Sequence, residues 1–285
     1  AVQLGLPVEK ALQMATIQPA RCYGLCHLGM IAPGRQADLV ILDNVTDLNV
    51  VDVYHCGKRI IKEEKTEVKI CPPYLKNTVH VSGFSEERLK LKHPGTKARV
   101  IQMQEKQIVT KAVLEEVPWV EENGGKYFAP DREYQKIAVI ERHKNTGKMG
   151  VGIVKGYGIC GGAIASSVSH DSHNIIVVGD NDHDMALAVK EMIRTQGGYT
   201  LVCNGEIYGT LPLPVMGLIS DAGYERVNEA LARMIPKAHE MGVKEGFDPF
   251  ITLSFMALPV IPEIRVTPRG IYLVNEDSII RTPFG

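Results

Sequence analysis

The sequence lacks the features of membrane proteins and of nucleic-acid-binding proteins. Its longest apolar runs, such as residues 255–261, are broken by Pro259 and fall far short of the roughly 20 residues that a membrane span needs. It has no excess of charge of one sign, since 32 Lys and Arg face 33 Asp and Glu and the net charge is -1. We therefore expect no membrane partner, no nucleic-acid partner and a cytoplasmic location.

Complete catalytic and metal-binding motifs are also absent. The sequence contains no H-x-H, H-E-x-x-H, P-C-x-x-C, G-x-S-x-G or phosphate-binding Walker motif. The six cysteines are scattered, and Cys22 and Cys26 have no second pair that would complete a zinc site. We expect reduced thiols and no metal site within this chain.

The chain has 285 residues, and the pattern in its first part predicts a helix followed by a small β unit. Pro7 suits a first helical turn, and apolar residues repeat at helical spacing over 8–15. Short apolar runs at 37–43 and 50–54 then predict two strands. A short polar helix is expected at 85–92, and His93-Pro94-Gly95 is typical of a boundary.

The remainder alternates between strand and helix patterns, which favours one α+β domain with a mixed or antiparallel sheet. Helices are expected at 184–195, closed by Gly197, and at 222–241, closed by Gly242. Asn145-Thr146-Gly147 is typical of a hairpin turn. The expected strands lie at 98–103, 136–141, 150–155, 175–179, 201–204 and 251–255.

One glycine motif indicates a possible dinucleotide site. Gly156, Gly158 and Gly161 form G-x-G-x-x-G after a strand, and Asp180 follows about 20 residues later. Lys155 is a poor residue for a buried parallel strand, and the serines after Gly161 are poor for the helix that should follow. Glycine-rich hairpins explain the pattern better, so a nucleotide-binding module is the weaker alternative.

Two polar clusters flank the expected strand 175–179. The first, 169–174 (Ser-His-Asp-Ser-His-Asn), supplies His170, Asp171 and His173 as candidates for substrate contact or acid–base chemistry. The second supplies the weaker candidates Asp180, Asp182 and His183, and the favoured interpretation of this cluster is that Asp182 caps the next helix. A strand of this length separates the clusters by roughly 15 Å, so one shared site is not expected. A calcium loop is excluded because Met185 occupies the position that needs glycine.

The run from Ala15-Thr16 through Pro19-Ala20 to the stretch 29–40 resembles the closing segment of amidohydrolase-superfamily enzymes. Three later stretches, 169–179, 211–221 and 249–263, resemble the C-terminal domain of bacterial adenine deaminases. The resemblance extends over nearly the whole chain. It implies that 1–27 is the end of a (β/α)8 barrel, 28–75 part of a small β domain, 76–93 a linker and 94–285 an α+β domain.

The resemblance also implies an activity for the complete enzyme: hydrolysis of adenine to hypoxanthine and ammonia by a metal-activated water. The metal, manganese or iron, would be bound by residues upstream of this chain, so no catalytic residue and no metal ligand is expected here. The implied partners are adenine, the remainder of the barrel and further copies in a homo-oligomer. We expect the loop 169–174 to face the active site, and the chain alone to be inactive. The alternative is a non-catalytic structural or oligomerisation module.

Overall fold

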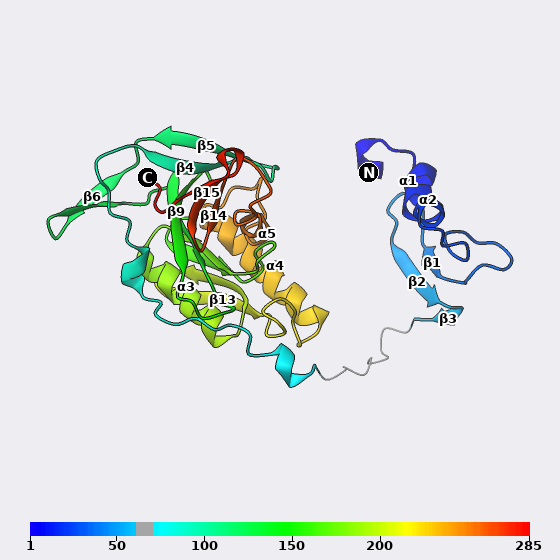
Figure 1. The fold of residues 1–285 in the computed structure, drawn as a ribbon. Helices are drawn as coiled ribbons and strands as arrows, with labels where there is room; N and C mark the ends of the chain where they lie inside the picture. Colours follow the sequence, from blue (N-terminus) through cyan, green and yellow to red (C-terminus); the bar gives the residue numbers. More distant parts are fainter. Residues whose placement is uncertain (61–70) are drawn as a thin grey trace. The chain divides into compact units, whose positions relative to one another are not determined.

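The computed structural model describes residues 1–60 and 71–285 and divides into two compact units, Ala1–Lys69 and Ile70–Gly285 (Figure 1). Each unit is considered by itself below. Residues 61–70 of the expected 28–75 segment lie outside the described residues. No helix in the described part is long and apolar enough to cross a membrane.

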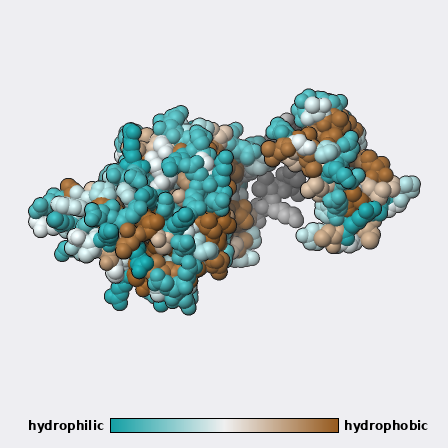
Figure 2. Space-filling model, turned by 90° about the horizontal axis from the view of Figure 1, so that it is seen from above, coloured by the Kyte–Doolittle hydropathy of each residue, from teal (hydrophilic) through white to brown (hydrophobic). Residues whose placement is uncertain are grey.

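The first unit contains the 3-10 helix η1 (Val2–Leu4), helices α1 (Val8–Ala15) and α2 (Ile17–Cys22), and the antiparallel sheet β1 (Leu39–Leu42), β2 (Val50–His55) and β3 (Lys58–Arg59). The expected helix and strands are confirmed, while α2 was not expected. Ala20 is the one buried residue among the described residues of this unit. Val50 and Val51, neighbours in sequence on β2, are both exposed, so neither sheet face is covered at the start of this strand. Hydrophobic residues accordingly gather on its surface (Figure 2).

The second unit is built on an eight-stranded sheet of order β13-β12-β10-β11-β8-β9-β4-β5. The β4–β9 pair is parallel and the other neighbours are antiparallel, so the predicted α+β class with a mixed sheet is confirmed. A separate hairpin is formed by β6 (Trp119–Glu122) and β7 (Gly125–Phe128). The strands of the large sheet are β4 (Ala98–Met103), β5 (Thr110–Glu115), β8 (Tyr134–Ile140), β9 (Met149–Lys155), β10 (Gly162–Ser166), β11 (Ile175–Gly179), β12 (Gly198–Cys203) and β13 (Glu206–Pro212).

Both faces of this sheet are covered, which explains its nearly continuous apolar strands. On β8, Ile137 and Val139 belong to one core cluster, and Ala138 and Ile140 belong to the other. Helix α3 (Asp182–Arg194) covers the second face. The first face is covered by α4 (Tyr224–Glu240), by α5 (Ile251–Ser254), and by a small sheet of β14 (Ile264–Thr267), β15 (Gly270–Leu273) and β16 (Ser278–Ile280).

The 3-10 helices of this unit are η2 (Pro73–Leu75), η3 (Glu86–Leu89) and η4 (Val274–Glu276). The short helix expected at 85–92 is therefore a single 3-10 turn. The expected linker 76–93 supplies three side chains to the second core: Val79, Leu89 and Leu91. Division of the chain into four segments stays a prediction.

Two expectations about the second unit are wrong. The strand expected at 251–255 is instead helix α5 (Ile251–Ser254), since a short apolar run fits either period. The glycine loop 156–161 joins β9 to β10, an antiparallel-sheet strand, where a dinucleotide site needs a helix. The phosphate would therefore have no helix N-terminus to bind, and that interpretation is rejected. The hairpin turn at 145–147 and both long helices are confirmed.

Candidate functional site

The loop 169–174 connects β10 to β11 and is anchored to α5. The amide of His170 donates to the carbonyl of Ser254 at 2.9 Å, and the His170 ring lies 5.1 Å from the Phe255 ring. The His170 and His173 rings are in edge contact at 5.5 Å between centroids, and both side chains are half-buried. Asp171 between them is exposed. The structure thus brings the two histidines together as a pair, with the carboxylate directed to the surface.

The surroundings of His173 favour its neutral form. Burial lowers its pKa, and the nearby His170 and Arg142 lower it further. Its Nδ1 atom accepts the backbone N–H of Ser169 at 3.3 Å, which leaves the proton of the neutral ring on Nε2. The Ser169 hydroxyl beside it is fully buried and has no hydrogen-bond partner among residues 1–60 and 71–285. A neutral imidazole donor is therefore available at one end of the loop, beside this buried hydroxyl.

Arg142 holds this loop in place and was not identified from the sequence. Its guanidinium donates through Nε to the carbonyl of His173 at 2.5 Å, through Nη1 to Thr78 at 3.2 Å and through Nη2 to Met216 at 3.0 Å. Arg142 is 1% exposed, and burial lowers its pKa to about 10. One side chain thereby joins three segments far apart in sequence. No local pattern identifies Arg142, apart from its place two residues beyond the end of the buried strand β8.

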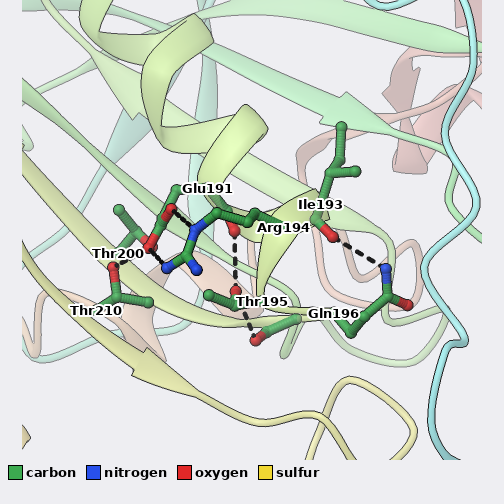
Figure 3. A network of polar contacts seen from close by, with 8 residues as sticks. Glu191, Ile193, Arg194, Thr195, Gln196, Thr200 and Thr210 are labelled. Carbon is green, nitrogen blue, oxygen red and sulfur yellow. Dashed lines mark hydrogen bonds and ion pairs between the residues drawn. The ribbon is translucent and has the colours of Figure 1, made fainter.

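The segment that contains Thr78 is fixed from its other side by the end of α3. The Gln196 side chain accepts the Val79 amide at 3.1 Å and donates to the Ile193 carbonyl at 2.9 Å. In the same region Glu191 accepts two hydrogen bonds from Arg194, both at 2.7 Å (Figure 3). Arg142 therefore binds a segment, the one that contains Thr78, that is itself held in position by Gln196.

The second polar cluster, at the opposite end of β11, is occupied by structural contacts. Asp180 accepts the amides of Gly161 and Gly162, at 2.5 and 3.0 Å. Asp182 pairs with the buried Lys136, whose pKa is lowered by burial although Asp182 opposes this. Asn181 caps α3 by accepting the Asp184 amide, so the expectation that Asp182 is the cap is wrong.

His183 is exposed and lies 3.5 Å from Glu86. Asp180 and Asp182 are engaged in the structural contacts described above. These three residues therefore form no common site with His170 and His173. Strand β11 separates them from the loop 169–174, as its length predicts.

One group in the described residues has the donor types for a metal ion: Asp38, His55 and Cys56. All three are exposed on the first unit, and His55 Nδ1 lies 3.0 Å from Asp38. Manganese and iron in hydrolases favour carboxylate and imidazole donors, whereas a thiolate suits softer ions. This group therefore does not fit the manganese or iron that the resemblance implies.

Comparison with protein families gives two matches along the chain. A model described as the adenine deaminase C-terminal domain matches residues 107–278, and one described as the amidohydrolase family matches residues 1–70. The first of these covers more than half of the chain. Both agree with the resemblance stated from the sequence.

Curated relatives align along nearly the whole chain. An adenine deaminase of Desulfitobacterium hafniense is 50% identical over 281 residues, covering 99% of this chain and 49% of the relative. One of Nitratidesulfovibrio vulgaris (strain DP4) is 42% identical over 282 residues, covering 98% and 48%. Adenine deaminase 2 of Carboxydothermus hydrogenoformans is 40% identical over 285 residues, covering 98% and 49%. The chain spans about half the length of the curated relatives it matches.

Proposed function

The chain belongs to the adenine deaminase family through its C-terminal domain, and on that premise we propose that it forms the C-terminal part of an enzyme that hydrolyses adenine to hypoxanthine and ammonia. The observation that carries the proposal is the family match over residues 107–278 together with identity to adenine deaminases along nearly the whole chain. A purely structural or oligomerisation module is the alternative.

We propose that the metal of this reaction is manganese or iron and that its ligands are residues outside this chain. The amidohydrolase match supports metal dependence, and the exposed Asp38, His55 and Cys56 group has the wrong donors. The exposed apolar surface of the first unit supports a partner that covers it, and we propose the remainder of the barrel. We also propose that the complete enzyme is a homo-oligomer and that it is located in the cytoplasm.

Within this enzyme we propose that the loop 169–174 encloses and positions adenine. Neutral His173 can donate from Nε2 to a purine ring nitrogen, and His170 presents its ring face beside Phe255. The role is one of contact and orientation, because the pair lies on a loop held by Arg142 rather than on a metal-binding scaffold.

The test replaces each histidine in the complete enzyme. His170→Asn or His173→Asn should lower kcat/KM roughly ten-fold, equivalent to about 1.4 kcal/mol, while metal content and melting temperature stay near wild type. His183→Asn, on the exposed start of α3, serves as the matched control and should leave kcat/KM unchanged. Kinetics of both loop variants equal to those of the control would reject the role of the loop. A loss of folding without a specific kinetic effect would assign the histidines to structure.

A further inference from the structure

Two adjoining cavities lie on the second unit between the β8–β9 turn and the β14–β15 hairpin. Their volumes are about 560 and 530 Å³, and they share four wall residues: Lys148, Pro268, Arg269 and Ile279. We call the combined space the cationic groove. No residue of the glycine loop 156–161 is among its lining residues.

The groove concentrates positive charge without matching carboxylates. One cavity is lined by Arg88, Lys148, Arg269 and Arg281, with no acidic residue among its lining. The other adds Lys144 and His143 and a single carboxylate, Glu141. None of these lysines and arginines is within ion-pair distance of a carboxylate in the described residues. Since the whole chain has a net charge of -1, this is a local feature.

The carboxylate of Glu141 is occupied by its own turn. It accepts the amides of His143 and Lys144 at 2.6 and 2.8 Å, and the amide and hydroxyl of Thr146 at 3.0 and 2.8 Å. Burial alone would raise its pKa, but these hydrogen bonds lower it to about 2. The same bonds fix the backbone of the turn that presents Lys144 and Lys148. Glu141 therefore orders the groove and has few lone pairs left to pair with its cations.

Arg88 is also positioned in advance. Its guanidinium donates to the carbonyls of Gly83 and Gly147 at 2.9 and 2.7 Å, which fixes its plane without neutralising its charge. A planar guanidinium with free N–H groups matches the oxygens of a phosphate. Arg269 and Arg281 are exposed and complete the cationic lining.

The other half of the groove is apolar and held rigidly. Its wall includes Pro259, Pro268, Tyr272 and Ile279. The hairpin that supplies Pro268 lies directly on β9 at Gly150, where a Cβ atom would overlap the Thr267 carbonyl. The Tyr272 hydroxyl donates to Asp277 at 2.7 Å, which orients its ring. Flat apolar walls beside a cationic end are the features of a pocket for an aromatic ring that carries a phosphate.

We propose that the cationic groove binds a small phosphorylated ligand with a flat ring, of the nucleoside-phosphate class. The phosphate lies among Arg88, Arg269 and Arg281, and the ring lies against Pro268 and Tyr272. A compact groove of this volume suits a small molecule, whereas a nucleic acid would need a basic surface that follows its backbone. The lining of the groove supports this site whether or not the proposed deaminase activity holds. Asn174, the last residue of the loop 169–174, nevertheless lines the same cavity.

The test is calorimetric titration of the full 285-residue chain at low salt. The probes are AMP, adenosine and inorganic phosphate. AMP should bind at least ten-fold more tightly than either of the others, because only AMP fills both halves of the groove. Arg269→Glu should weaken AMP binding at least ten-fold. Lys111→Glu makes the same change of charge at an exposed position of β5 and should have no effect. Circular dichroism verifies that both variants remain folded.

Several results would overturn the proposal. Absence of AMP binding by the wild-type chain at roughly millimolar ligand would remove the site, and an equal loss in both variants would indicate non-specific attraction. Inorganic phosphate that binds as tightly as AMP would eliminate the ring subsite. Single-stranded RNA that binds far more tightly than AMP would replace the small ligand by a polymer.

Discussion

Replacement of Arg142 by lysine tests whether one buried guanidinium positions the loop 169–174. Arg142 donates to carbonyls of His173, Thr78 and Met216, which belong to three separate segments. Lysine keeps the positive charge but has a single nitrogen and no planar fork. In Arg142→Lys the ammonium can serve one of these carbonyls in the observed geometry, and two partly buried acceptors lose their partner.

The expected cost follows from those two acceptors. A buried carbonyl left without a donor costs roughly 1 to 3 kcal/mol, so two partly buried ones, each near the low end of this range, cost about 3 kcal/mol. For a unit of this size, 1 kcal/mol corresponds to about 2 to 4 °C of melting temperature. The transition of the second unit should therefore fall by about 6 to 12 °C.

The melting temperature of Arg142→Lys is measured by thermal denaturation. The matched control is Arg132→Lys, which makes the same change at an exposed position. Hydrogen exchange should also become faster at 169–174 in the first variant. A fall of less than about 2 °C with unchanged exchange would refute the reasoning, since the carbonyls would then be satisfied without the guanidinium.

Further predictions concern His173, Gly217 and the isolated chain. Because the folded-state pKa of His173 lies below its ordinary value of about 6.5, the unfolded state takes up the proton first. The contribution of neutral His173 to the free energy of unfolding is therefore fully present above about pH 6.5 and is lost as the pH falls below that value. The melting temperature should accordingly fall more steeply with decreasing pH in wild type than in His173→Asn. Equal slopes would contradict this. Gly217→Ala, at φ 72° with a Cβ 2.8 Å from Arg142 Nη1, should lose about 2 kcal/mol more than Gly205→Ala, at φ 81° in open space, and equal losses in urea denaturation would disprove the close contact. The purified 285-residue chain supplied with manganese should release no ammonia from adenine, and measurable release would show that the metal ligands lie within it.

Local patterns were sufficient where an element's own residues determine its conformation. Helix α3 ends before Gly197, and the β8–β9 hairpin turns at Asn145 and Gly147, as predicted. Strand β8 was predicted from its run of apolar residues, and the structure buries that run on both faces of the sheet. The identity of the sheet neighbours could not be predicted, because pairing depends on contacts between residues far apart in sequence.

Errors arose where local patterns allow two structures. The apolar run 251–255 fits a strand as well as a helix, and packing on the sheet face decided for α5. Asn181 and Asp182 are both good capping residues, and the pairing of Asp182 with Lys136 of β8 left the cap to Asn181. The candidate loop was found from its histidines, but its support by Arg142 exists only in three dimensions.

The hairpin over Gly150 has a consequence for biosynthesis. Every strand of the eight-stranded sheet lies between residues 98 and 212, whereas the β14–β15 hairpin that covers β9 begins at Ile264. A ribosome therefore releases all the strands before it releases the cover. A premature stop codon just ahead of Ile264 would yield a chain with a fully paired sheet whose apolar face is left uncovered over β8 and β9, a substrate for chaperones and proteases rather than a shorter working protein.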